Sequence, residues 1–397
     1  MLLSSTSHRL EHVHRTPPAS LRWIVGQRFD LVWFVGGALS GYAMFFLHAG
    51  LSLDMLTVWF VWFVCLDSPH FFGTYSRTYL DREQWRERRG LLLGSLALFL
   101  VPPLVLLASF AMHRIGLPHA TAGLVALAAV VNLWAYWHVV RQHYGIMALY
   151  QRKNDDTDPS DRRIDSLLLY TGLLAPFAAF LVRHPETRAV LGLAPMRDAG
   201  AWEASFVRAV VATSATAVVV VALVFASRQL QRWRLGLAVN VPKTLFLSAV
   251  VPLHLSIGYS EAVLTAPILG FAAFVTIFHD VQYHAIVWFY QRNRYRNDDA
   301  ARFGPAAWVG RSFVTFMACA LTSGAIMGFA SCSLGVQPGC TPLLDTSAMT
   351  LFGDVTFRDL FFGVFLGFLM HHYFLDQFIW RPSRDERLRL DLDLAVT

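Results

Sequence analysis

The chain contains few charged residues and no polar stretch long enough to form a soluble domain. Asp, Glu, Lys and Arg make up only 15% of its 397 residues, whereas soluble domains carry about 25%. The composition is 55% hydrophobic and the mean hydropathy is +0.45. These values exclude an ordinary soluble enzyme. They predict an all-α, polytopic integral membrane protein with one membrane domain over residues 29–381.

Cysteine is also scarce, with four residues in the chain and no CxxC pair. This excludes the common zinc-ribbon and dithiol redox motifs. Cys65 and Cys319 lie in apolar stretches, where we expect unreactive core thiols. Cys332 and Cys340 flank a short loop predicted to lie outside the cell, where a disulfide would be stable. The sequence leaves open whether these two residues pair.

The apolar stretches are long enough to predict about ten transmembrane helices. Residues 241–258 form the weakest of them, because Pro242 and Pro252 fall within it. The membrane domain is flanked by a basic, flexible N-terminal tail, residues 1–28, and by a C-terminal tail, residues 382–397. The predicted spans are 31–51, 55–76, 90–112, 119–150, 164–183, 206–227, 241–258, 262–290, 308–330 and 356–380.

The basic residues predict the orientation of the chain. If the N-terminus is cytosolic, the cytosolic segments hold 25 of the 33 Lys and Arg residues, and the outer segments hold six. The positive-inside rule then places both termini in the cytosol, in what we expect to be a bacterial inner membrane. The same asymmetry accounts for the net charge of +6 without a nucleic-acid partner, and no nucleic-acid-binding motif is present.

Seven of the fifteen histidines lie in four short segments near the ends of long apolar stretches. Each segment falls on an even-numbered predicted span, so all four spans run in the same direction. At 1.5 Å per residue, the segments lie roughly 22–26 Å below the outer boundary. They therefore share one depth near the cytosolic face, where membrane histidines are usually functional. We take all seven as candidate metal ligands: His70, His138, His143, His279, His284, His371 and His372.

Three aspartates accompany these histidines, namely Asp67, Asp280 and Asp376. A carboxylate can bind a metal or accept the second N–H of a metal-bound imidazole. Two of the segments share the spacing His-x4-His, and residues five apart lie about 140° apart around a helix. Two ligands at this spacing need a distorted helix or two metal ions. Alternatively, one histidine binds the metal and the other orients it.

The remaining histidines are scattered along the chain, and interfacial histidines can be purely structural because their rings are amphipathic. We expect that role for those near the outer side: His48, His113, His119, His184 and His254. The three in the N-terminal tail could bind metal adventitiously: His8, His12 and His14.

Neutral imidazoles with a few carboxylates suit iron, zinc, copper or nickel. The HExxH motif of zinc proteases is absent. A haem needs only one pair of axial histidines, and seven histidines at one depth exceed that need. A non-haem iron site, dinuclear rather than mononuclear, uses these ligands best, and haem is the alternative cofactor.

The histidine segments resemble the histidine boxes of membrane di-iron enzymes: fatty-acid desaturases, hydroxylases and alkane monooxygenases. A weaker resemblance connects the chain to bacterial membrane-bound carotenoid dioxygenases. Both resemblances imply histidine-bound iron in a membrane protein, and the first implies a site at the cytosolic boundary. The residues that carry the first resemblance are His138/His143 and His279/His284 for the first box, and His371-His372 for the paired histidines that end the other boxes.

From these observations we expect a membrane metalloenzyme that uses O2 to hydroxylate, desaturate or cleave a lipid-soluble substrate. The histidines would bind iron, while Asp67, Asp280 and Asp376 would bind it or orient the ligands. A soluble electron donor would reach the site from the cytosol, and the basic loops could hold that donor or anionic membrane lipids. The alternatives are a proton- or metal-ion-coupled transporter and a haem-containing electron-transfer protein.

Overall fold

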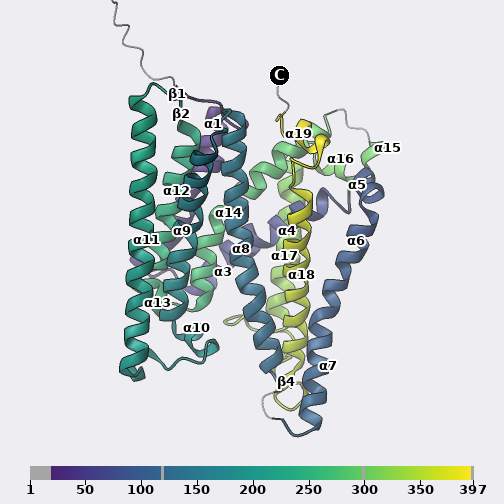
Figure 1. Cartoon of the computed structure of the whole chain (residues 1–397). Helices are drawn as coiled ribbons and strands as arrows, with labels where there is room; N and C mark the ends of the chain where they lie inside the picture. Colours follow the sequence, from purple (N-terminus) through teal and green to yellow (C-terminus); the bar gives the residue numbers. More distant parts are fainter. Residues whose placement is uncertain (1–18, 118–119, 297–299, 395–397) are drawn as a thin grey trace, which may run out of the picture.

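The computed structural model describes residues 19–117, 120–296 and 300–394, and these residues fold mainly into helices. Eight helical segments of this described part are long and apolar enough to cross a membrane (Figure 1). The chain is therefore an all-α, multi-pass integral membrane protein.

Three of the eight segments each consist of three consecutive shorter helices. The first contains α1 (Gln27–Asp30), η1 (Leu31–Val35) and α2 (Ala38–Leu51), and the second contains α3 (Met55–Trp59), η2 (Phe60–Asp67) and α4 (Ser68–Ser76). The third contains α6 (Arg89–Ser95), η3 (Leu96–Leu100) and α7 (Val101–Arg114). The other five are single helices: α8 (Ala122–Lys153), α9 (Pro159–Arg183), α11 (Ala201–Arg234), α12 (Val241–Gly258) and α17 (Phe313–Ser333).

Two of the ten predicted spans, 262–290 and 356–380, are not among these eight. They correspond to α14 (Ile268–Arg294) and α18 (Phe357–Ile379), which are long enough to cross a bilayer but contain His, Asp and Gln residues. Both helices run through the bundle beside the apolar ones (Figure 1). Eighteen of the 27 residues of α14 are buried, so its polar side chains face protein rather than lipid. That placement avoids the cost of polar groups in hydrocarbon.

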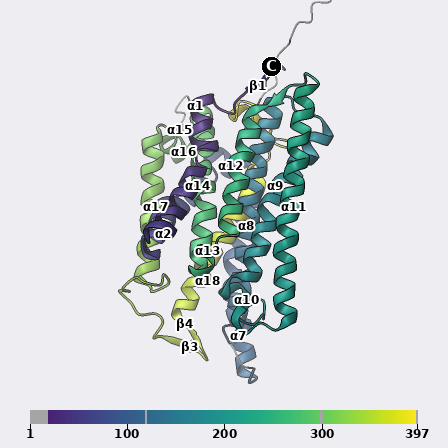
Figure 2. The same ribbon diagram turned by 90° about the vertical axis from the view of Figure 1, so that its left-hand side faces the viewer.

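Four helices meet in the centre of the bundle. α14 contacts α4 and α8, and α18 contacts the same two helices from the other side, so the four form a closed circuit. α9, α11 and α12 pack together on one side of it, and α17 packs against η2 and α4 on the other (Figure 2). The residues that sequence analysis selected lie on the helices of the central circuit, or directly before α4 in the case of Asp67.

A π-helical stretch, η2, leads into α4 immediately before Pro69. The N–H of Ser68 bonds to the carbonyl of Phe63, five residues earlier. Proline has no N–H, and its ring collides with the carbonyl four residues before it in a regular α-helix. The wider π turn relieves that collision, and such turns occur frequently at functional sites. Gly324 of α17 allows close packing here, because a Cβ at that position would collide with the Val64 carbonyl.

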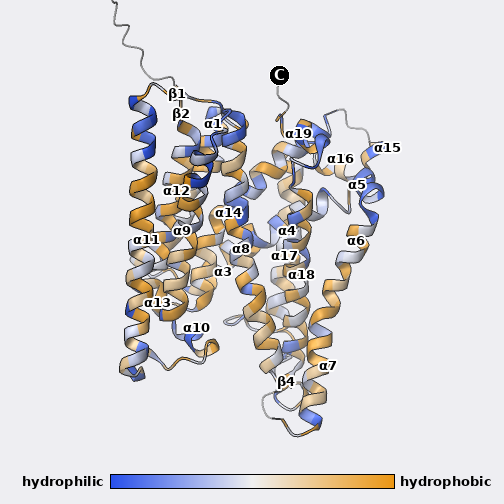
Figure 3. Cartoon of the chain, in the orientation of Figure 1, coloured by the Kyte–Doolittle hydropathy of each residue, from blue (hydrophilic) through white to orange (hydrophobic). Residues whose placement is uncertain are grey.

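Short elements cover the two ends of the bundle. The first and last described residues lie at the same end (Figure 1), as an even number of crossings requires. Hydrophilic residues surround α5 and α19 at that end, and the middle of the bundle is mainly hydrophobic (Figure 3). Assignment of this end to the cytosol stays a prediction.

The short elements at the ends of the bundle are two strand pairs and seven short helices. The strand pairs are the parallel β1 (Ala19–Ser20) and β2 (Val239–Asn240), and the antiparallel β3 (Thr350–Phe352) and β4 (Val355–Thr356). The helices are α5 (Arg82–Glu87), α10 (Pro185–Val190), η4 (Met196–Asp198), α13 (Glu261–Thr265), α15 (Ala300–Phe303), α16 (Pro305–Val309) and α19 (Glu386–Asp391).

Both terminal segments contribute to the packed structure. In the C-terminal segment, Leu388 and Leu392 are buried, and α19 contacts α14. In the N-terminal segment, Ile24 is buried, while residues 1–18 lie outside the described part of the chain. Cys332 and Cys340, which the sequence left open, form a disulfide.

Candidate metal centre

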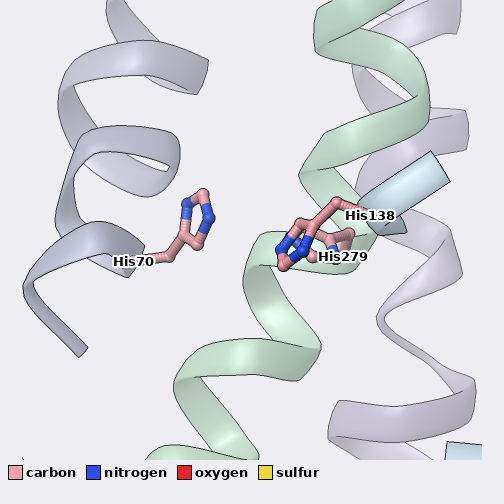
Figure 4. A group of neighbouring side chains, drawn as sticks. All are labelled: His70, His138 and His279. Atoms are coloured by element: carbon pink, nitrogen blue, oxygen red, sulfur yellow. The ribbon is translucent and has the colours of Figure 1, made fainter. Parts of the chain in front are cut away.

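One histidine from each of the four predicted segments enters a single buried cluster. The ring centroids of His70 and His279 are 5.2 Å apart, and those of His279 and His138 are 5.0 Å apart. His138 and His372 follow at 4.9 Å, and His372 and His70 close the circuit at 4.5 Å. We call these four residues the histidine ring. Figure 4 shows His70 extending from its helix toward His138 and His279.

The order of the four residues in the histidine ring follows the order in which their helices contact one another. His70 lies on α4, His279 on α14, His138 on α8 and His372 on α18, and these helices contact one another in the same cyclic order. All four side chains are at least 93% buried. Ligand atoms of His70, His138 and His279 lie within 4.8 Å of one another, as do those of His138, His372 and Asp376. Donors this close can surround one ion.

The hydrogen bonds around His372 fix which of its nitrogens faces the ring. Its Nδ1 lies 2.8 Å from the Thr74 hydroxyl, which lies 2.8 Å from Asp376 Oδ1 and donates to it. Thr74 therefore accepts the Nδ1–H of His372, and the lone pair of His372 is on Nε2. That Nε2 lies 2.9 Å from Nε2 of His70. Two nitrogens at this distance match adjacent ligands, each about 2.0–2.1 Å from a shared ion.

The other nitrogen of His70, Nδ1, lies near two carboxylates. Nδ1 of His70 lies 3.2 Å from Asp280 Oδ1 and 3.7 Å from Asp67 Oδ1. Neither contact is a hydrogen bond. With an ion in place of the Nε2···Nε2 contact to His372, a carboxylate beside Nδ1 would favour a proton there and leave the Nε2 lone pair for the metal, as at most ligating histidines. Nδ1 and the two carboxylates form a further group of potential ligands on the opposite side of His70 from the ring.

Asp376 presents one oxygen to the ring and uses the other for hydrogen bonds. Its Oδ1 accepts from Thr74 and, at 2.9 Å, from the hydroxyl of Tyr283. Its Oδ2 lies 3.8 Å from Nε2 of His138 and 3.9 Å from Nε2 of His372. Two hydroxyl donors therefore set the carboxylate so that Oδ2 can serve as a fifth ligand.

Several buried atoms of this cluster have no hydrogen-bond partner among the described residues. They are His70 Nδ1, His138 Nε2, His279 Nδ1 and both oxygens of Asp280. Buried polar groups are almost always hydrogen-bonded, and an unpaired buried carboxylate is costly. None of the three aspartates has a Lys or Arg ion pair among the described side chains. A cation in the cluster would satisfy these groups, so the residues present fit a metal.

Three of the seven predicted ligands lie outside the ring. His371 points away from it: its Nε2 lies 2.8 Å from the hydroxyl of Tyr79 and 3.0 Å from that of Ser95. His284 donates from Nε2 to the Leu66 carbonyl at 3.2 Å. His143 lies beside Phe278, and neither of its nitrogens has a hydrogen-bond partner in the described part of the chain.

Helix geometry explains this division. Adjacent residues on a helix point about 100° apart, and residues five apart point about 140° apart. Only one member of each predicted pair can therefore face the same centre. A ligand role for any of the seven residues stays a prediction.

Thr74 and Tyr283 are functional candidates that the sequence reasoning missed. Both contact Asp376, and their hydroxyls lie 2.6 Å from each other. The sequence contains a spacing that indicates both residues, because Thr74 follows His70 by four residues and Tyr283 follows His279 by four. Residues at that spacing share one face of a helix.

The outer histidines differ in their surroundings. His48 contacts the Leu53 carbonyl and His184 contacts the Ala266 carbonyl, which are structural contacts. His113 packs near Phe352, while His119 and the three tail histidines lie outside the described residues. His254 is buried four residues before the end of α12, and its ring lies 5.7 Å from that of His143, a contact that the sequence did not predict.

Comparison of the chain with family models, with curated proteins and with solved structures gives no match.

Proposed function

We propose that this protein is a membrane-embedded non-haem iron enzyme that uses O2 to hydroxylate, desaturate or oxidatively cleave a lipid-soluble substrate. The observation that carries the proposal is the histidine ring with its unpartnered nitrogens and carboxylate oxygens. Several neutral imidazoles with a carboxylate form a donor set that suits iron. Adjacent rings are only 4.5–5.2 Å apart, which leaves no room for a porphyrin between neighbours.

The residues of this site would have two roles, as metal ligands and as groups that orient those ligands. His70, His138, His279 and His372 would hold the iron, and Asp376 Oδ2 would complete its protein ligands. The iron, when bound, would supply the binding and activation of O2. Thr74 and Tyr283 keep Asp376 in position through its other oxygen. Asp280, whose Oδ1 lies 3.2 Å from Nδ1 of His70, would favour the tautomer of His70 that has a free Nε2.

A second iron position is available on the other side of His70, where Asp67, Asp280 and Nδ1 meet. Filling both positions makes the dinuclear centre that the sequence favoured. The number of iron ions per chain distinguishes the two arrangements. One ion leaves Asp280 as an orienting group, and two ions make Asp67 and Asp280 ligands.

The surroundings of the ring support a lipid-soluble substrate. Phe71 lies 4.9 Å from the ring of His372, and Tyr373 lies 4.9 Å from the ring of His138. The whole site is enclosed by membrane-crossing helices, so an apolar molecule can approach from the bilayer more readily than an ionic one. A soluble reductant would donate electrons at the end of the bundle that carries the basic loops.

Metal analysis and an optical spectrum of the purified protein test this proposal. We expect one or two iron ions per chain and no Soret band. His279→Gln and His372→Gln should each remove most of the iron, because the remaining ligands bind about 10–100-fold more weakly. His371→Gln is the matched control, since this neighbour of His372 is hydrogen-bonded to Tyr79 instead. A haem spectrum, or equal iron loss in the control, would contradict the proposal.

An oxygen electrode tests the activity itself. Iron-loaded protein in lipid bilayers, supplied with a reductant and a lipid extract, should consume O2 faster than the His372→Gln protein. Metal transport into sealed vesicles without O2 consumption would instead support a transporter.

A further inference from the structure

A second pair of buried histidines lies outside the histidine ring. His143 of α8 and His254 of α12 are both at least 99% buried, and their ring centroids are 5.7 Å apart with an angle of 85° between the planes. Phe278 and Phe246 enclose His143 at 5.3 and 6.1 Å. The candidate iron site uses neither histidine.

The hydrogen bonds of His254 determine where its proton lies. Its Nδ1 lies 3.0 Å from the Tyr136 hydroxyl, which donates to the Leu173 carbonyl at 2.7 Å. Because Tyr136 has given its only proton to Leu173, it must accept from Nδ1–H of His254. The lone pair of His254 is therefore on Nε2, which has no hydrogen-bond partner among the described residues.

His143 also has an unshared lone pair. Neither of its nitrogens has a hydrogen-bond partner among the described residues. A neutral imidazole has a proton on only one nitrogen, so the other nitrogen of His143 keeps a free lone pair.

Two imidazole lone pairs consequently share one apolar enclosure without a hydrogen-bond donor from the described residues. His254 has its second nitrogen directed at the Tyr136 hydroxyl, as metal-binding histidines usually have theirs directed at an oxygen. At the observed ring separation of 5.7 Å, a nitrogen of each ring can reach one ion at about 2.0 Å. We propose that His143 and His254 form a second metal site that holds a monovalent copper ion.

Charge selects a monovalent ion. Neither His143 nor His254 has a carboxylate within ion-pair distance among the described residues, in contrast to three histidines of the ring. An ion here would be balanced only by neutral donors. The desolvation free energy of a buried ion rises with the square of its charge, so burying a divalent ion costs about four times as much as burying a monovalent one. Among metals that favour imidazole, copper is the one with a stable monovalent state.

Copper titration of a protein with a disabled ring tests this site separately from the proposed iron centre. The double variant His70→Gln/His372→Gln removes two ring ligands. Under anaerobic reducing conditions, with a chromophoric Cu(I) chelator as competitor, it should bind one Cu(I) per chain. Adding His143→Gln or His254→Gln should weaken that binding by at least ~10-fold. His184→Gln is the control, because His184 is equally buried but contacts the Ala266 carbonyl.

X-ray absorption at the copper edge gives a second measurement that needs no variant at this site. Iron-loaded wild-type protein with one added Cu(I) should show imidazole nitrogen neighbours at about 2.0 Å. A folded ring-disabled protein that binds no Cu(I) would overturn the proposal and indicate a bridging water. Unchanged copper affinity after His143→Gln would overturn it as well. Either result leaves the iron content of the wild type, and so the proposed function, untouched.

Discussion

Two buried polar regions of this molecule use their charges in opposite ways. The first, which we call the salt-bridge network, joins α9, α11 and α12 at the end where the termini lie. Nζ of Lys243 lies 2.5 Å from Asp156 and 2.7 Å from Asp165, and Asp161 is paired with Arg228 and Arg232. Each of these carboxylates therefore has a cationic partner.

The second region is the cluster around the histidine ring. It contains three buried aspartates, none of which has a Lys or Arg partner among the described residues. Within the described part of the chain, neither oxygen of Asp280 has a hydrogen-bond partner. The salt-bridge network therefore needs no further cation, whereas the second region could hold a metal ion.

Removing Lys243 should produce the largest effect on the fold. Lys243→Met leaves Asp156 and Asp165 buried without their shared cation, and breaking a buried ion pair costs about 3–5 kcal/mol. Denaturant titration of the purified protein in mild detergent measures this loss of unfolding free energy. The iron content of the molecules that remain folded should not change.

Lys153→Met is the matched control for that variant. Lys153 pairs with Asp393, whose side chain is 78% exposed, and such surface pairs contribute about 0–1 kcal/mol. If both lysine variants lost equal stability, the network would not be the structural element that we describe.

Replacing Asp280 tests whether this buried carboxylate contributes to metal binding or to the stability of the fold. In metal-free protein, Asp280→Asn removes an unpaired buried charge, so we expect stability equal to or greater than that of the wild type. In the presence of iron, the same variant should bind metal about 10–100-fold more weakly, because His70 loses its orienting carboxylate. Iron titration and thermal unfolding with and without iron measure both effects.

Asp30→Asn controls for burial in this experiment. Asp30 is as buried as Asp280, but it accepts backbone N–H bonds from Ile24, Val25 and Gly26. Its replacement should lower stability equally with and without iron. A metal-free Asp280→Asn protein that is as destabilised as Asp30→Asn would show that Asp280 is structural.

The sequence was sufficient to predict which helices meet, but not which side chains face one another. Positive charges and apolar lengths placed four histidine segments at one depth, and one histidine of each segment is in the ring. The choice between His371 and His372, or between His138 and His143, depends on the rotation of each helix within the bundle. That rotation is set by packing among helices distant in sequence, such as α4 against α18, and hydropathy does not encode it.

The ten predicted spans include α14 and α18, whereas eight helical segments of the described chain are apolar enough to be recognised as candidate spans. α14 and α18 carry two of the four ring histidines, together with Asp280 and Asp376. A criterion based on apolar composition passes over these two helices, although it recognises the segments that carry His70 and His138. The position of His254 could not be read from the sequence either, because its contact with His143 joins helices about one hundred residues apart.

The smallest effect that we predict concerns a single hydroxyl. Tyr283→Phe keeps the aromatic contact with His70 at 5.4 Å but loses the hydrogen bond to Asp376 Oδ1. Thr74 still holds that oxygen, so the loss should be that of one hydrogen bond, about 1 kcal/mol, or roughly fivefold in iron affinity.

The double variant Thr74→Val/Tyr283→Phe removes both hydroxyl donors, and its effect should exceed the sum of the two single effects, as expected for groups that share one partner. Iron-binding titrations of four proteins form the complete cycle: the wild type, Thr74→Val, Tyr283→Phe and the double variant. A loss of more than about a hundredfold in Tyr283→Phe alone would exceed the energy of one hydrogen bond. Tyr283 would then be acting on the metal itself rather than through Asp376.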